Sequence, residues 1–148
     1  MTDKRPKLDS TKSVPLRHPT DVNELPLGDR KRMLVIDESD LARRALVEFF
    51  RERDWHVASA NAALVALDLA LKQQPHVIVT ELVLPDVEGY HFIRTLRAAI
   101  VDDVRVIAAT SISETMFSRA RGAGVDLVLP KPLDLGIVEA LITDLVTR

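Results

Sequence analysis

Five short apolar runs, separated by segments of helical length, constrain the fold of this chain more than any other feature. The runs are MLVID (33–37), HVAS (56–59), HVIVTE (76–81), VRVIAAT (104–110) and DLVLP (126–130). Several are apolar on both faces, which is typical of strands in a sheet that is covered on both sides. Because parallel strands need a crossover of about a dozen residues, the alternation predicts an α/β fold with a parallel sheet.

The segments between and after these runs predict five helices. The first begins at Ser39, a residue type that favours the N-cap position. The second contains the leucines between 64 and 71, and the third starts near Gly89. A weaker fourth helix covers 113–121, and the last covers 135–146. Helices are therefore expected on both faces of the sheet.

Composition divides the chain near residue 31. Residues 1–31 hold four of the eight prolines and show no periodic apolar face, which predicts a flexible N-terminal tail followed by one folded domain over 32–148. The tail has seven basic and five acidic residues, and the domain has 13 and 17. A net charge of -2 argues against binding to nucleic acid or to an anionic membrane.

Two absences narrow the class of protein further. The chain has no cysteine, which excludes disulfides, thiolate catalysis and Cys-ligated metal sites. No stretch approaches 18 consecutive apolar residues, and the first thirty residues lack the apolar core of a secretory signal. The expected localisation is therefore cytoplasmic.

The strand ends carry the residues with chemistry. In open parallel sheets, functional groups gather beyond the carboxyl ends of the strands. These positions hold Asp37 and Glu38, then Glu81, then Thr110, then Lys131. Three carboxylates beside one ammonium must raise a pKa, pair with the lysine or recruit a hard cation such as Mg²⁺. With three negative charges against one positive charge, binding of a cation is the simplest way to balance them.

Four motifs carry a resemblance to a known family. The strings MLVIDES, HVIVTELVLPDVEG, VIAATS and LVLPKP resemble, in order and spacing, the receiver domain of two-component response regulators. The resemblance covers essentially all of residues 32–148. It implies a flavodoxin-like, doubly wound sheet of five parallel strands in the order 2-1-3-4-5. It also implies a phosphorelay signalling role rather than an enzymatic one.

The resemblance also implies roles for the residues at the strand ends. Asp37, Glu38, Glu81 and the Val83 backbone would bind Mg²⁺, and Glu81 occupies the phosphoacceptor position. Thr110 and Lys131 would contact the phosphoryl group. A cis peptide bond is expected before Pro132.

Two positions depart from the family pattern. Glu81 stands where the family has an aspartate, and its extra C–C bond moves the carboxylate by about 1.5 Å, whereas a misplacement near 1 Å can cost about a hundredfold in rate. Val128 stands where the family often has an aromatic switch residue. We therefore expect Glu81 to imitate a phosphoaspartate in part, with a charge of about -1 against about -1.5 to -2. Asp86 is expected to be a turn residue rather than a substitute acceptor.

The favoured interpretation is a single-domain atypical receiver that acts through protein–protein interaction without phosphorylation. Its expected partner is a histidine kinase or another signalling protein, with a homodimer through the fourth and fifth helices as a further possibility. Three alternatives stay open: phosphorylation of Glu81 by a histidine kinase, a decayed site on a surviving scaffold, and an unrelated flavodoxin-like ligand binder. The last is disfavoured because no glycine-rich phosphate loop follows the first strand.

Overall fold

The computed structural model describes residues 30–100, 103–111, 113 and 116–147, so the predicted tail lies almost wholly outside the described residues. Within them, five parallel strands form one sheet in the order β2-β1-β3-β4-β5. The predicted topology is therefore confirmed. The strands are β1 (Arg32–Ile36), β2 (His56–Ala60), β3 (Val77–Thr80), β4 (Arg105–Thr110) and β5 (Leu127–Pro130).

Five helices connect and follow the strands. They are α1 (Asp40–Arg51), α2 (Ala63–Gln73), α3 (Gly89–Ala99), α4 (Phe117–Ala123) and α5 (Leu135–Thr147). Ser39 is the N-cap of α1, as predicted, because its hydroxyl accepts a hydrogen bond from the amide of Ala42 at 3.2 Å.

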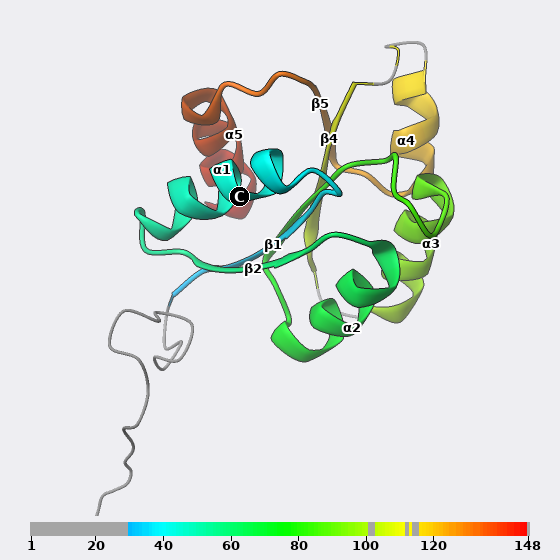
Figure 1. The fold of residues 1–148 in the computed structure, drawn as a ribbon, viewed down its shortest axis with the longest axis horizontal. Coiled ribbons are helices and arrows are strands. Elements are labelled where there is room, and N and C mark those ends of the chain that lie inside the picture. Colours follow the sequence, from blue (N-terminus) through cyan, green and yellow to red (C-terminus); the bar gives the residue numbers. More distant parts are fainter. Residues whose placement is uncertain (1–29, 101–102, 112, 114–115, 148) are drawn as a thin grey trace, which may run out of the picture.

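The helices cover both faces of the sheet, with α1 and α5 on one side and α2, α3 and α4 on the other (Figure 1). Each face has its own apolar core. Phe50, Ile142 and Val35 belong to the core between the sheet and α1 and α5. Ile93 and Leu96 belong to the core on the other face of the sheet. All five side chains are fully buried. The double cover explains why the strand sequences are apolar at successive positions.

Helix α4 begins later than the sequence indicates, and residues 114 and 115, within the predicted helix, lie outside the described residues. The prediction placed its start at 113, whereas the helix begins at Phe117. Met116 takes the N-cap position and makes no side-chain capping bond, so no local signal fixes an earlier start. The helix ends at Ala123 and is followed by Gly124 as C-cap, whose φ of 120° lies in a region that favours glycine.

Arg97 on α3 fastens the far end of α4 to the rest of the domain. Its guanidinium donates to the carbonyl oxygens of Gly124 at 2.8 Å and Val104 at 2.6 Å. It also forms an ion pair with Asp126 at 2.7 Å. One side chain thus joins α3, the end of α4 and the starts of β4 and β5.

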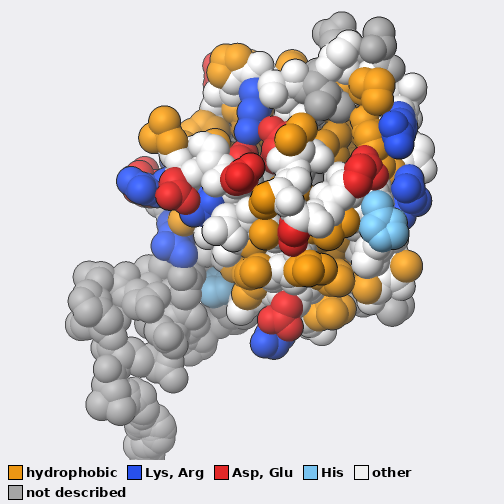
Figure 2. Space-filling view, turned by 45° about the vertical axis from the view of Figure 1, so that its right-hand side comes forward, with side chains coloured by type: hydrophobic (Ala, Val, Ile, Leu, Met, Phe, Trp, Pro, Cys, Tyr) orange, Lys and Arg blue, Asp and Glu red, His pale blue; other side chains and the backbone are white. Residues whose placement is uncertain are grey.

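The surface of the described part is mixed in character. Figure 2 shows acidic side chains set singly among hydrophobic ones on one face, with most Lys and Arg side chains towards its margins. No helix within the described ranges is long and apolar enough to span a membrane.

Candidate functional site

The carboxyl edge of the sheet brings the predicted residues together. Asp37 directly follows β1, Glu81 follows β3, Thr110 ends β4 and Lys131 follows β5. Backbone bonds carry the sheet one residue beyond its strands: Glu81 N donates to Ile36 O and Lys131 N to Thr110 O, both at 2.9 Å. The backbones that carry these side chains are therefore fixed by the sheet itself.

The Glu81 carboxylate receives hydrogen bonds on both oxygens. Its Oε2 accepts from the hydroxyl of Thr110 at 2.6 Å and from the backbone amides of Leu82 at 2.6 Å and Val83 at 3.1 Å. Its Oε1 lies 3.1 Å from the Lys131 ammonium. Glu81 is only 7% exposed. The side chain has thus turned back over its own loop, so that four donors surround one carboxylate.

Lys131 bridges two buried carboxylates. Its Nζ lies 2.6 Å from Oδ2 of Asp37 as well as 3.1 Å from Glu81. The other oxygen of Asp37 accepts the amide of Ser39 at 2.9 Å, and the guanidinium of Arg43 donates to the Asp37 carbonyl at 2.7 Å. The peptide bond between Lys131 and Pro132 is cis, as predicted.

These contacts set the protonation of the site. Burial alone would raise the pKa of Glu81, but hydrogen bonds from Thr110, Val83, Lys131 and Leu82 outweigh it and hold that pKa below its ordinary value. Burial alone would lower the pKa of Lys131, but Asp37 and Glu81 raise it above its ordinary value. Glu81 is therefore an anion and Lys131 a cation at neutral pH.

The predicted metal ligands are only partly assembled. Asp37 and Glu81 converge, whereas Glu38 is exposed, and no group of three His, Cys, Asp or Glu side chains within the described residues could hold a metal ion. Val83 turns its amide towards Glu81. Because Lys131 already bridges the two carboxylates, this arrangement does not fit a divalent cation: the cation would have to displace the ammonium.

Two donors of the site were missed by sequence reasoning, namely the amides of Leu82 and Val83. They are held in place by the start of α3. A Cβ on Gly89 would lie 2.2 Å from the carbonyl oxygen of Leu82, so only glycine allows α3 to approach the loop this closely. The sequence signal for this contact was the glycine eight residues after Glu81.

Asp86, predicted to be a turn residue, caps a different helix. Its carboxylate accepts from the amides of Ala63 at 2.8 Å and Leu64 at 3.0 Å, and these bonds lower its pKa. Ala62, the N-cap residue of α2, provides no side-chain cap. The loop after β3 therefore satisfies the open amides of α2 from 22 and 23 positions away.

An apolar hollow lies beside the ion pair. It has a volume of about 450 Å³, and Asp37 and Lys131 form its polar end. Its apolar lining comes from α1 and from the segment after β5: Ala42, Ala45, Leu46, Pro132, Leu133 and Leu135. Val128, at the predicted switch position, is buried in the core of the opposite face.

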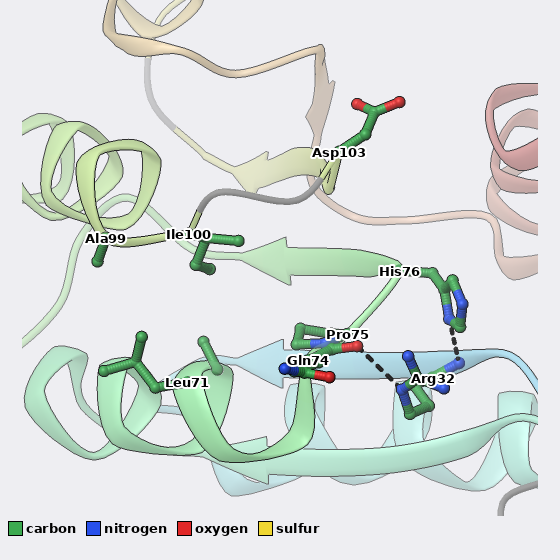
Figure 3. Close-up of a pocket in the computed structure, with 9 residues that line it drawn as sticks. Arg32, Leu71, Gln74, Pro75, His76, Ala99, Ile100 and Asp103 are labelled. Atoms are coloured by element: carbon green, nitrogen blue, oxygen red, sulfur yellow. Dashed lines mark hydrogen bonds between the residues drawn. The ribbon is translucent and has the colours of Figure 1, made fainter.

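A second hollow lies at the opposite edge of the sheet and contains none of the predicted site residues (Figure 3). Arg32 donates from its amide to Nδ1 of His76 at 3.0 Å, and from Nε to the carbonyls of Gln73 and Gln74 at 3.0 and 2.9 Å. These bonds close the end of α2. His76 directly precedes β3, so its role here is structural.

Known proteins with similar sequences are response regulators, in agreement with the geometry of the site. The sequence model of the family described as "Response regulator receiver domain" matches residues 33–143. Among curated proteins, the response regulator MprA of Mycobacterium leprae is 29% identical over 119 residues, which cover 79% of this chain and 51% of that protein. The chain thus spans about half the length of the MprA proteins that it matches.

Solved structures show the same fold. A two-component response regulator from Clostridium difficile superimposes with a TM-score of 0.77 at 22% identity, covering 80% of this chain and 98% of that one. A response regulator from Burkholderia pseudomallei, with a phosphorylated aspartic acid, a calcium ion and citrate, gives a TM-score of 0.69 at 26% identity. That match covers 74% of this chain and 65% of the other.

Proposed function

Because the chain belongs to the receiver domain family of response regulators, we propose that it is an atypical receiver with Glu81 at the phosphoacceptor position. In this proposal it works in two-component signalling as a protein-interaction switch that needs no phosphorylation. It is a cytoplasmic binding module rather than an enzyme, and it carries no nucleic-acid site.

The observation that carries the proposal is the set of four donors around the Glu81 carboxylate. Thr110, Lys131 and the two loop amides surround its oxygens within 3.1 Å. Thr110 and Lys131 are the residues that, by resemblance, contact a phosphoryl group. The extra methylene lets the carboxylate reach both of them without a phosphate. A charge of about -1 replaces about -1.5 to -2, so the imitation is partial.

The same contacts argue against phosphoryl transfer to Glu81. Phosphoryl transfer requires the attacking oxygen to lie in line with the donor. Oε2 of Glu81 is engaged by three donors and Oε1 by the lysine. The lowered pKa of Glu81 also makes its carboxylate a weaker nucleophile. A donor phosphate would have to break these contacts before it could approach.

In this proposal the Lys131 ammonium supplies the positive charge that a divalent cation would otherwise bring to the two carboxylates. The Burkholderia pseudomallei relative contains a calcium ion together with its phosphorylated aspartic acid. Here one ammonium lies within 3.1 Å of both buried carboxylates, which balances much of their charge. The proposed switch is therefore independent of Mg²⁺.

The proposed partner is a histidine kinase or another signalling protein. The apolar hollow beside Lys131 gives such a partner a surface next to the site. Self-association through α4 and α5 is a further proposal, and sedimentation of the full chain at increasing concentration tests it.

The test compares the protein with a Glu81→Asp variant. Both are incubated with Mg²⁺ and a small phosphodonor such as acetyl phosphate, and intact mass is measured. We expect no phosphoryl gain for the natural chain and a gain of one phosphoryl group for Glu81→Asp, whose shorter side chain leaves room for transfer. A stoichiometric gain on Glu81 would overturn phosphorylation-independent function. No gain on Glu81→Asp would overturn the assignment of position 81.

A further inference from the structure

The outer edge of β2 is open at Ser59. This strand lies at one border of the sheet, with α1 beside it (Figure 1). On its inner side, the His56 amide donates to Lys31 O at 2.9 Å and Ala60 O accepts from Asp37 N at 3.1 Å. Backbone groups alternate in direction along a strand, so those of Val57 and Ser59 point outwards. Those of Ser59 have no partner within the described residues.

Arginines of α1 flank this open edge. Arg51 donates to the outward carbonyl of Val57 at 2.9 Å, which places its guanidinium at the edge itself. Arg44 is exposed and forms no ion pair within the described part of the chain. Both line a hollow of about 290 Å³ that also contains Ser59. Arg43, at one end of this hollow, is already paired with Asp40.

Helix α1 places its two arginines along the same stretch of the sheet edge as Val57 and Ser59. Arg44 and Arg51 are seven residues apart on α1, which separates them by about 10.5 Å along the helix. Val57 and Ser59 are about 6.6 Å apart along β2. The connecting helix runs back against the strand direction, which places Arg51 near Val57 and Arg44 near the Ser59 end. Alternate side chains of an added strand would be about 6.6 Å apart on the α1 face, and the long arginine side chains would span the remaining difference of about 4 Å.

We propose that the edge of β2 binds an extended acidic segment of a partner protein. The backbone of that segment pairs with Ser59, and its alternate Asp or Glu side chains meet Arg44 and Arg51. Charge selects this occupant over others. A second copy would bring the same arginines, and residues 1–31 of this chain carry more basic than acidic residues. The proposal uses no group of the Glu81 pocket, so it stands or falls separately from the proposed function.

The experiment titrates the ¹⁵N-labelled full chain with an end-blocked peptide of alternating threonine and glutamate. Amide and guanidinium shifts are followed by NMR. We expect saturable shifts centred on Val57 to Ala60 and on the Nε groups of Arg44 and Arg51. The same peptide with lysine in place of glutamate should give none. A peptide with a central proline should bind more weakly, because proline removes a ladder donor.

Variants separate strand pairing from general charge attraction. Reversing both arginines (R44E, R51E) should weaken binding about tenfold or more. The matched control (R94E, R121E) reverses two exposed arginines on α3 and α4 and should leave binding unchanged. Ser59→Pro removes one outward donor from an edge strand, where proline is tolerated, and should also weaken binding. Equal losses in both double variants, or no shifts at β2 with the natural chain, would overturn the proposal.

Discussion

The Lys131 ammonium lies 2.6 Å from a carboxylate oxygen of Asp37, a residue 94 positions earlier in the chain. This contact joins the end of β5 to the end of β1, across two intervening strands. Because the same ammonium also contacts Glu81, removing it would leave two buried carboxylates without a counter-ion. The internal cation is therefore a structural part of the site.

Replacing Lys131 by methionine should destabilise the fold at neutral pH by about 2 kcal/mol. Loss of one partner from a fully buried pair costs about 3–5 kcal/mol, and the partial exposure of Lys131 reduces that cost. The loss should shrink as pH falls towards about 4, because the carboxylates can then take up protons. Urea unfolding at pH 7 and at pH 4 measures both effects.

Lys72→Met is the matched control for this change, since Lys72 forms an exposed pair with Asp68 at 3.0 Å. It should cost about 0.5 kcal/mol or less. Mg²⁺ should raise the melting temperature of Lys131→Met but not that of the natural chain, because only the variant frees both carboxylates. Equal Mg²⁺ responses would contradict the role of Lys131 as the resident cation.

Thr110→Val should destabilise the protein by about 1–2 kcal/mol at pH 7, because a buried carboxylate loses a donor. It should also raise the pKa of Glu81. A carboxylate whose folded pKa is depressed adds stability above its unfolded pKa of about 4.3, and this stability is lost as pH falls through the folded value. The variant and the natural chain should therefore converge in stability at low pH.

Measurement of the Glu81 carboxyl carbon shift against pH, together with urea unfolding, tests this. Thr95→Val is a suitable control, since the Thr95 hydroxyl donates to the carbonyl of His91 in its own helix at 2.9 Å. A constant difference between Thr110→Val and the natural chain from pH 7 to pH 3 would mean that Thr110 does not act through Glu81.

Gly89→Ala should destabilise the protein by at least about 2 kcal/mol, because the new methyl group meets the Leu82 backbone. It should also move the Leu82 amide away from Glu81, which is visible as a large amide shift at Leu82 and Val83. Gly122→Ala is the control. Its added methyl group meets no atom of the described residues within 4 Å, so a gain of about 0.5–1 kcal/mol is expected in helix α4. Similar losses in both variants would contradict the close approach.

Asp86→Ala should loosen the first turn of α2. Hydrogen exchange at Ala63 and Leu64 should become faster, whereas Asp86→Asn, which keeps one acceptor oxygen, should retain part of the protection. Asp68→Ala, on the exposed side of the same helix, should leave these two amides unchanged. Unaltered exchange in Asp86→Ala would show that another group caps the helix.

The positions of the strand ends in the sequence allowed the central residues of the site to be predicted. Glu81, Thr110 and Lys131 each close or follow an apolar run, and parallel strands bring such positions to one edge whatever the details of packing. The sequence could not show that Glu38 points away. Successive residues of an extended chain face opposite sides, and one position decides which of two adjacent acids enters the pocket.

Contacts made by loops were beyond sequence reasoning. The backbone amides of Leu82 and Val83 carry no residue signature, and Asp86 caps a helix whose start lies more than twenty positions away. Both depend on how the loop after β3 folds over its neighbours. The start of α4 was misplaced for a related reason, because no capping side chain marks Phe117 as the first residue.

The three bonds of Arg97 hold the C-terminal end of α4 against the neighbouring strands. One of them goes to the carbonyl of Gly124, the C-cap residue of α4, whereas Met116 at the N-cap makes no side-chain capping bond. A helix that is fixed at its C-terminal end can move most at its N-terminal end. A displacement of β4 that begins at the Glu81 site should therefore move Phe117 more than Gly124. A partner protein that binds the first turn of α4 would therefore be the most sensitive to the state of the site.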